Sequence, residues 1–298
     1  MKMQSVNVQQ VRVSDETRLA RWLERQTRCY ARFSLVDLRE WLSTHDGFVA
    51  EQPDGVLLGL ILMAGVTRDH ASIIGLAVGD RSDEEEILFA LFRHALPHLR
   101  DRGINQLTCI TNSEWTATAL PKYLGFRFAG NLANYLKVDW GIPDFGNRSV
   151  YVSAALPDDT DQILSVDRVS FPEFWQQEEH ILVSILNEGG YLFKAEWKRL
   201  IVGYTSGVWG NGRGHINRLA VHPQLQRLGI GTRLLAESIS FLHKAGASRI
   251  TLNTQVENTA SRRLYERFGF RLIDCDTQIL TRSLDEPETP SAVPAPQM

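Results

Sequence analysis

The sequence predicts an α/β (α+β) protein built from two tandem domains, and three observations lead to this fold class. The chain has 298 residues, enough for about two domains that each bury a core. Segments with strand-like alternation and segments with helical spacing of apolar residues follow one another along the chain. Finally, residues 73–128 are similar to residues 216–272.

The internal similarity extends over the length of a domain. Leu-Ala-Val precedes a loop at 76–78 and again at 219–221, a glycine follows a long helix at Gly103 and Gly246, and a Gly-Phe pair follows the next helix. The offset is 143 residues for the first two landmarks and 144 for the last. Solenoid repeats have periods of about 20–50 residues, so this offset indicates a duplicated domain.

The duplication sets the expected domain bounds. We expect a first domain at 1–140, a linker at 141–148, a second domain at 149–283 and a disordered tail at 284–298. The junction lies in "DWGIPDFGNRS", where Gly, Pro, Asn and Asp interrupt both helical and strand patterns. The tail is rich in proline and contains few large apolar residues.

The elements of the second domain follow in order. "SVYVSAAL" predicts a strand, and helices are expected around 159–169 and 174–188. "YLFKAEW", "RLIVGYTSGVW" and "HINRLAV" predict strands, with "GNGRG" as the turn between the last two. A long helix from about Gly229, the strand "SRITLNT", the helix "NTASRRLYERF" and a closing pair of strands complete the domain.

Composition excludes several functional classes. The formal net charge is −3 and no block is rich in Lys or Arg, which argues against a nucleic-acid partner. No apolar run approaches the ~20 residues of a spanning helix, and the N-terminus lacks a secretory signal, so we expect a cytoplasmic protein without a membrane partner. His94 and His98 flank Pro97 without a carboxylate at ligand spacing, so we expect no metal site. The oligomeric state is not predicted.

The start of the long helix, "QRLGIG" at 226–231, is unusual because it has no capping side chain. The corresponding helix of the first domain begins with "SDEEE", in which Ser82 and Glu85 predict a capping box. A strand that leads through a glycine-containing loop into a helix leaves backbone N–H groups for an anion such as a phosphate. Arg227 and Arg233 can support such a site; the alternative is an irregular turn.

The second domain resembles the GNAT acyltransferase superfamily. In "LAVHPQLQRLGIGTRLL" the Q/R-x-x-G-x-G/A loop of that superfamily is matched by Gln226, Gly229 and Gly231. "NTASRRLYERFGF" resembles its second motif at Asn258, Ala260, Leu264, Tyr265, Gly269 and Phe270. The close resemblance covers residues 215–271. It implies that each domain has a mixed, mostly antiparallel central sheet flanked by helices.

The resemblance also implies an acetyl-CoA site. The pyrophosphate would lie on loop 226–232, and the pantetheine arm would lie beside a strand that diverges from its neighbour and leaves backbone groups of Leu219 and Val221 for hydrogen bonds. Asn258 would contact the cofactor near its thiol. The implied cofactor-binding residues are Leu219, Ala220, Val221, Gln226, Arg227, Leu228, Gly229, Ile230, Gly231, Thr232 and Asn258.

Candidate catalytic and acceptor residues follow from the same resemblance. Tyr265 is the candidate proton donor to the leaving thiolate, and the alternative is a tyrosine that only packs in the core. His215 is a candidate general base because it lies on the strand that leads to the acyl site, and the alternative is an ordinary half-exposed histidine. Phe171, Phe174 and Trp175 can line an acceptor pocket or anchor two helices to the sheet.

The first domain lacks this chemistry. Its loop carries Asp80 and a run of acidic residues that would repel a pyrophosphate, and Pro121 takes the place of Tyr265. We therefore expect an acyl-CoA-dependent N-acyltransferase, most simply acetyl-CoA with direct attack by an amine, either a small molecule or a peptide N-terminus. The alternative is a non-catalytic CoA-binding or scaffolding protein.

Overall fold

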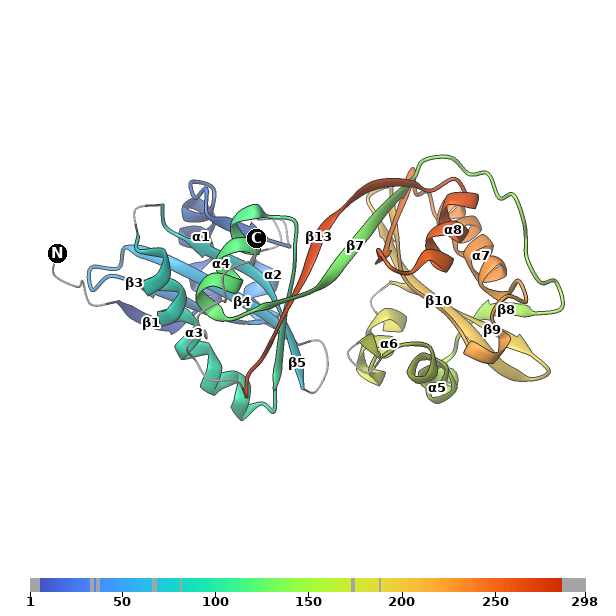
Figure 1. The fold of residues 1–298 in the computed structure, drawn as a ribbon, viewed down its shortest axis with the longest axis horizontal. Coiled ribbons are helices and arrows are strands. Elements are labelled where there is room, and N and C mark those ends of the chain that lie inside the picture. The colour runs from blue at the N-terminus through green and yellow to red at the C-terminus, as the bar shows by residue number, and fades with distance from the viewer. Residues whose placement is uncertain are drawn as a thin grey trace, which may run out of the picture. The chain divides into compact units, whose positions relative to one another are not determined.

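The computed structural model describes residues 6–32, 35, 38–65, 69–80, 82–172, 175–187 and 189–285, and the predicted tail therefore lies outside the described residues from 286 onward. The chain divides into two compact units (Figure 1). The first unit contains residues up to Asn131 and residues from Asp276, and the second contains Leu132–Cys275. Among the described residues, no helix has the length and apolarity to cross a membrane.

The first unit has one mixed sheet in the order β1-β3-β4-β5-β6-β13, in which the β5–β6 pair is parallel. One core cluster lies between this sheet and α3 and α4, and a second one joins the sheet to α1 and α2. Its elements are β1 (Asn7–Gln10), a 3₁₀ turn (Val13–Asp15), α1 (Glu16–Leu23), β2 (Cys29–Ala31), α2 (Leu38–Thr44), β3 (Asp46–Glu51), β4 (Leu57–Gly65), β5 (His70–Val78), α3 (Glu84–Asp101), β6 (Gln106–Thr111) and α4 (Glu114–Leu124).

The second unit repeats this plan with the sheet order β8-β9-β10-β11-β12-β7, in which the β11–β12 pair is parallel. Its elements are β8 (Tyr151–Ala154), a 3₁₀ turn (Pro157–Asp159), α5 (Thr160–Ser170), α6 (Glu179–Asn187), β9 (Tyr191–Trp197), β10 (Leu200–Gly210), β11 (Arg213–Val221), a 3₁₀ turn (Pro223–Leu225), α7 (Ile230–Lys244), β12 (Arg249–Gln255) and α8 (Thr259–Arg267).

Helices cover both faces of the second sheet. Tyr204 of β10 packs in a core with α5 and α6, whereas the next residue, Thr205, contacts Ser238 of α7. Because successive strand residues point to opposite faces, α5 and α6 lie on one face and α7 on the other. The β10–β11 hairpin closes through Asn211 and Gly212, both with positive φ, within the segment "GNGRG" that predicts the turn.

The duplication extends to strand register. In the first unit the parallel pair joins His70–Ile73 to Gln106–Cys109, and in the second it joins Arg213–Ile216 to Arg249–Leu252, each 143 residues later. Both sheets also contain a register shift at the corresponding place, between Leu62 and Met63 and between Ser206 and Gly207. The two repeats therefore share their backbone geometry as well as their sequence landmarks.

Each sheet receives its last strand from the other repeat. β7 (Arg127–Lys137) follows α4, and its residues from Leu132 to Lys137 pair with β12 of the second unit. β13 (Arg271–Ser283) follows α8, and its residues from Gln278 to Ser283 pair with β6 of the first unit.

This exchange differs from the sequence expectation in two respects. A single strand, β13, follows α8 instead of the expected pair. The position in the second sheet that the other strand of the pair would take is occupied by β7, next to β12. The compact units are discontinuous, whereas we expected contiguous domains at 1–140 and 149–283. Alternation along a strand identifies its buried face but does not identify the sheet edge that it joins.

The long helix α7 begins at a backbone conformation that suits glycine. Gly229 is the residue before the helix and has a φ of +75°, and no side chain caps the helix. Gly231, two residues further on, has an ordinary conformation, and a methyl group there would lie 3.6 Å from Leu219 Cδ2 and 3.7 Å from Val221 Cγ2. The two glycines of "GIG" therefore have different structural requirements.

These requirements predict opposite effects of two alanine substitutions on stability. Gly229→Ala places a side chain in the left-handed region and should lower the free energy of unfolding by about 1–2 kcal/mol. Gly231→Ala adds a good helix former at ordinary van der Waals contact and should leave stability unchanged or raise it by up to about 1 kcal/mol. Urea unfolding of the full chain, followed by circular dichroism, measures both; equal loss in the two variants would contradict this description of the loop.

Candidate functional site

The central strands of the second unit diverge beside the Gly229 loop. β11 and β12 are paired only from Arg213 to Ile216, and β11 continues to Val221 without a strand neighbour on that side in the described part of the chain. The divergence begins at a bulge, because Ser206 pairs with Arg218 and Gly207 with Ile216, which leaves Asn217 unpaired. The expected splay of these strands is present.

The open side of β11 presents backbone groups of alternate residues. On the other side Ala220 pairs with Tyr204, and the His222 N–H donates to Val202 O at 2.9 Å. Since alternate residues of a strand bond to the same neighbour, Leu219 and Val221 direct their backbone groups away from β10. Val221 O accepts side-chain hydrogen bonds from Gln226 Nε2 at 3.3 Å and Ser170 Oγ at 3.2 Å.

The edge leads directly to the uncapped start of α7. The first-turn N–H groups of a helix have no acceptor within the helix, and no side chain caps Gly229. Arg227 is exposed and has a φ of +63°, which places its side chain at the rim of the loop. Gln226 binds the strand rather than the loop, so its observed contact stabilises the turn. The loop thus combines open backbone donors with a neighbouring positive charge.

The first unit shows what the same edge can bind. Residues 28–32 run along β5: Tyr30 pairs with Leu76, Arg28 O accepts from Val78 N at 3.0 Å, and Ile74 O accepts from Arg32 N at 2.8 Å. Leu76 and Val78 are the counterparts of Leu219 and Val221 at the offset of 143 residues. The chain itself therefore occupies, in the first unit, the backbone edge that is open in the second.

The same segment also closes the first unit's loop. The Arg28 guanidinium donates to Gly79 O and, at 3.2 Å, to Ser82 O, while Thr27 N and Oγ1 donate to Asp80 Oδ1 at 3.1 and 2.8 Å. Asp80 therefore has partners within its own unit. Sequence comparison identified the acidic character of this loop but not the segment that fills the adjacent edge.

The predicted Ser82/Glu85 capping box is wrong in detail. α3 begins at Glu84, and Asp83 is the capping residue, whose carboxylate accepts from Glu86 N at 3.0 Å. Asp and Ser cap helices about equally well, and the sequence pattern alone did not distinguish adjacent candidates. The conclusion that α3 is sealed by a side chain, unlike α7, is unchanged.

Tyr265 lies on α8 and is buried, at 7% exposed. Its ring lies 6.0 Å from the ring of Tyr135, a residue of the exchanged strand β7, and 6.0 Å from that of Phe270. Burial raises the pKa of Tyr265 to about 12, and a hydrogen bond with Ser261 opposes this in part. Tyr265 therefore packs in the core, and its phenol holds a proton at neutral pH.

His215 lies on β11 two residues before the bulge. Its neighbours Gly214 and Ile216 face α7, so its side chain lies on the α5 and α6 face. The imidazole is half-buried and its Nδ1 lies 2.8 Å from Thr251 Oγ1. Asn258 caps α8, since its side-chain oxygen accepts from Ser261 N at 3.2 Å.

On this α5 and α6 face, Phe171 and Trp175 meet at a buried ion pair that the sequence analysis missed. Arg218 donates to both carboxylate oxygens of Asp167, at 2.8 and 3.1 Å, and its guanidinium lies 3.6 Å from the centre of the Phe171 ring. Arg218 also donates to Trp175 O, and Tyr204 OH donates to Asp167. Phe174 lies outside the described residues.

Two signals could have identified this pair. Arg218 interrupts the apolar strand "HINRLAV", and Asp167 lies on the apolar face of a predicted helix, next to Val166 and near Ile163. Opposite charges at two core-facing positions favour contact because an unpaired buried charge is costly. The pair ties α5 to the strand at the bulge and so fixes the wall of the site on this face.

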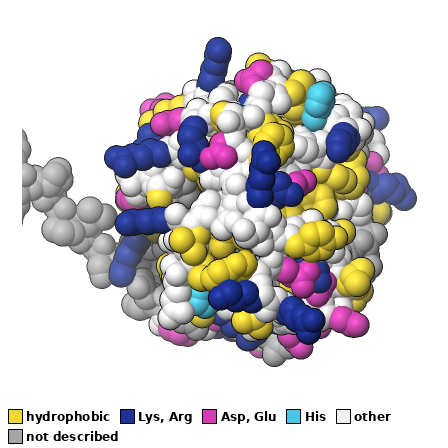
Figure 2. Space-filling model, turned by 90° about the vertical axis from the view of Figure 1, so that its right-hand side faces the viewer, with side chains coloured by type: hydrophobic (Ala, Val, Ile, Leu, Met, Phe, Trp, Pro, Cys, Tyr) yellow, Lys and Arg dark blue, Asp and Glu magenta, His cyan; other side chains and the backbone are white. Residues whose placement is uncertain are grey.

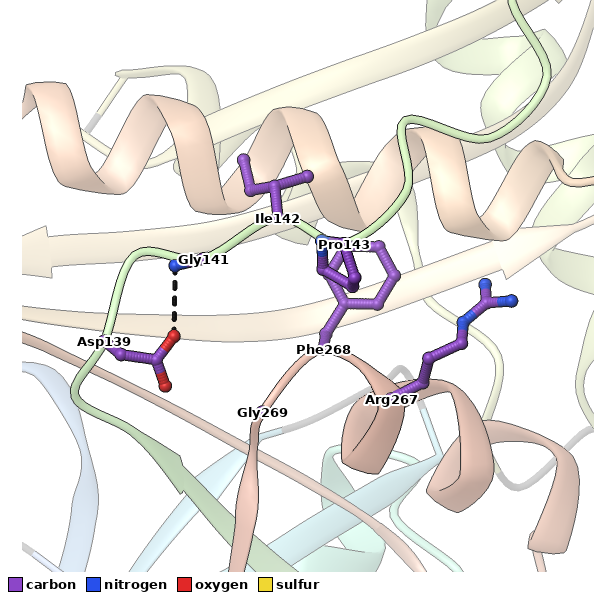
Figure 3. A pocket seen from close by; sticks show the side chains of 7 residues that line it. All are labelled: Asp139, Gly141, Ile142, Pro143, Arg267, Phe268 and Gly269. Atoms are coloured by element: carbon purple, nitrogen blue, oxygen red, sulfur yellow. Dashed lines mark hydrogen bonds between the residues drawn. The ribbon is translucent and has the colours of Figure 1, made fainter.

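A separate pocket of about 320 Å³ lies between the chain that follows β7 and the end of α8 (Figure 3). It is lined by Asp139, Gly141, Ile142, Pro143, Arg267, Phe268 and Gly269. None of the predicted site residues lines it. Among the residues that the structure describes, no group of three or more His, Cys, Asp or Glu is arranged to hold a metal ion.

Surface charge in the second unit is dispersed where it is visible. On the face shown in Figure 2, Lys and Arg side chains alternate with acidic and hydrophobic ones and form no continuous basic patch.

Comparison with known proteins supports the relationship that the motifs indicate. The model of the acetyltransferase (GNAT) family matches residues 160–270. An N-alpha-acetyltransferase of Sulfurisphaera tokodaii is 32% identical over 127 residues, which cover 38% of this chain and 75% of that protein. An uncharacterized N-acetyltransferase of Methanocaldococcus jannaschii is 35% identical over 97 residues, or 32% of this chain and 60% of that protein.

Solved structures resemble both units together. A tandem GNAT protein from the clavulanic acid biosynthesis pathway superposes with a TM-score of 0.66 at 16% identity, over 94% of this chain and 99% of that one. A GCN5-related N-acetyltransferase from Sphaerobacter thermophilus gives 0.68 at 15% identity, over 96% and 98%. These likenesses establish a two-domain GNAT fold. With the sequence relatives, they show that the chain belongs to the acetyltransferase (GNAT) family and is an N-acetyltransferase.

Proposed function

We propose that the second unit transfers the acetyl group of acetyl-CoA to an amine, and that the chain binds one acetyl-CoA. The observation that carries this proposal is the contrast between the two repeats. In the described chain no strand pairs with Leu219 or the Val221 N–H on this side and no side chain caps α7, whereas the corresponding positions of the first unit are filled by residues 27–32 and by Asp83.

The pyrophosphate fits the start of α7. The N–H groups of Ile230, Gly231 and Thr232 converge with the positive end of the helix dipole, an arrangement that favours an anion. Arg227 adds a positive charge at the rim. Leu228, exposed beside it, belongs to the same loop.

The pantetheine arm fits the open edge of β11. Its amide groups can pair with Leu219 and with the Val221 N–H, as Tyr30 and its neighbours pair with Leu76 and Val78 in the first unit. An N–H on this edge can also stabilise the oxygen of the acyl carbonyl, on which charge develops as the amine attacks. Ala220 directs its backbone to β10 and holds the strand in place.

Proton transfer is assigned to two side chains on the second unit. Tyr265 retains its proton at neutral pH and can donate it to the departing thiolate, whose conjugate acid has a pKa of about 8.5. His215 faces α5 and α6 and can accept a proton from the attacking amine. Phe171 and Trp175 flank the Arg218 side chain on this face and offer an apolar surface to the acceptor.

The acceptor class is an amine, either a small molecule or a peptide N-terminus. Support comes from relatives named N-alpha-acetyltransferases in Sulfurisphaera tokodaii and Schizosaccharomyces pombe. The amine nitrogen of a small molecule and that of a peptide N-terminus must each lose a proton to attack, so the two acceptors require the same base. A panel of small amines and short peptides, assayed by release of free CoA, distinguishes the two.

Calorimetric titration with acetyl-CoA should give one site per chain. Arg227→Glu should weaken binding by about tenfold or more, because it places a negative charge beside the pyrophosphate, at a cost of about 1.4 kcal/mol per tenfold. Arg249→Glu is the matched control. Arg249 is an exposed arginine at the start of β12, where it pairs with Arg213 at the end of β11 that lies away from Val221. Two equivalent sites would contradict the assignment of the first unit as a closed domain.

Tyr265→Phe should lower kcat by about 10²-fold or more while the KM for acetyl-CoA stays near the wild-type value, because the phenol acts in proton transfer and not in binding. Tyr135→Phe removes a neighbouring buried hydroxyl and should leave kcat near wild type. Steady-state kinetics with the best amine of the panel measures both. An unchanged kcat in Tyr265→Phe would assign the tyrosine to packing alone.

A further inference from the structure

We propose that the segment between β7 and β8 acts as a strap that holds the pyrophosphate loop in its binding conformation, and that Asn147 is a positioning residue for the cofactor. The strap is defined here as residues 139–149. This inference rests on the proposed function of the loop, and it assigns a role to a segment that the sequence analysis treated only as a linker. All of its contacts described below lie within the second unit.

One end of the strap is anchored near the end of α7. The Trp140 ring stacks on His243, in the last turn of the helix, with 4.4 Å between ring centres and 6° between planes. Asp139 Oδ1 accepts from the buried Lys137 Nζ at 2.6 Å and from Gly141 N at 3.0 Å, the second of which is drawn in Figure 3. The strap therefore begins from a fixed point.

The other end is bound to the loop before α7. Asn147 N donates to Gly229 O at 3.1 Å, and Asn147 Nδ2 donates to Leu228 O at 2.9 Å. Gly146, with a φ of +65°, approaches so closely that a methyl group there would lie 2.4 Å from Gly229 O and 2.5 Å from Arg233 N. Only glycine permits this close contact, so the position of the strap against the loop depends on Gly146.

These two hydrogen bonds constrain where the loop's N–H groups point. A trans peptide unit is planar, so its C=O and N–H point in opposite directions. Fixing Leu228 O therefore orients the N–H of Gly229. Gly229 O, which also accepts from Arg233 N of α7 at 3.0 Å, orients the N–H of Ile230. Asn147 binds the carbonyl side of two successive peptides and leaves their donor side for a phosphate.

The loop needs such support because its backbone is unusual. Arg227 and Gly229 both have positive φ, and the non-glycine residue carries a conformational cost of about 1–2 kcal/mol. No side chain caps α7 from within the loop. Arg267 adds a further link, since it donates to Thr232 Oγ1 at 2.8 Å and lies 3.8 Å from Asp144 Oδ2 of the strap.

The test compares Asn147→Ala with Ser149→Ala, an exposed strap residue whose backbone N–H bond is retained. Asn147→Ala removes the side-chain bonds to Leu228 O and from Ser149 N and retains the backbone bond to Gly229 O. It should raise the KM for acetyl-CoA about 3- to 10-fold, the effect of losing the one side-chain hydrogen bond to the loop, with kcat and the KM for the amine unchanged. Amide hydrogen exchange of residues 226–232 should accelerate in the ligand-free variant, while the last turns of α7 keep their protection. Ser149→Ala should match the wild type in both measurements.

Unchanged exchange at 226–232 in Asn147→Ala would overturn the strap, and faster exchange with an unchanged KM would overturn its role in cofactor binding. Gly146→Ala serves as a second variant, because its side chain must displace the strap and should reproduce both effects at larger size. If the wild-type chain binds no acetyl-CoA, the proposed function fails, and the ligand-free exchange comparison still decides whether the strap orders the loop.

Discussion

The divergence of β11 from β12 is the constraint on which the rest of the site depends. Once the strands part after Ile216, the backbone of β11 must find hydrogen-bond partners other than β12. The two repeats meet this requirement differently. The first uses its own residues 28–32, whereas the second presents the edge beside an uncapped helix. Backbone geometry common to both repeats is thus closed by the chain itself in the first and is left beside an uncapped helix in the second.

Much of this organisation could be predicted from the sequence because it depends on local patterns. The glycines of "GIG" and the missing cap indicated the open start of α7, and the Asn211-Gly212 pair indicated the hairpin before β11. The paired region and the bulge lie at the expected offset of 143 residues in both repeats. These features are encoded within a few residues of where they act.

Features that depend on distant partners could not be predicted. The exchange of β7 and β13 requires knowledge of which edge each strand joins, and alternation is the same for either edge. The insertion of Tyr30 beside Leu76 joins residues 46 positions apart, and no local pattern in "TRCYAR" indicates it. The Asp167–Arg218 pair was visible only as two charges at apolar positions.

The exchange and the strap both place chain from before β8 within the second unit. β7 contributes Tyr135 beside Tyr265, and the chain that leaves β7 continues as the strap to Gly229. Residues before position 149 therefore contribute to the core and to the loop of the second unit. The first repeat is therefore followed directly by chain that belongs to the second unit.

The central claim is that acetyl-CoA occupies backbone positions in the second unit that the first unit fills with its own chain. Backbone amide chemical shifts of the full-length protein, recorded with and without acetyl-CoA, test it most directly. The account predicts large changes at Leu219, Val221 and residues 230–232, and none at Leu76, Val78 or residues 84–86. Changes centred on the first unit, or no change at residues 230–232, would contradict it.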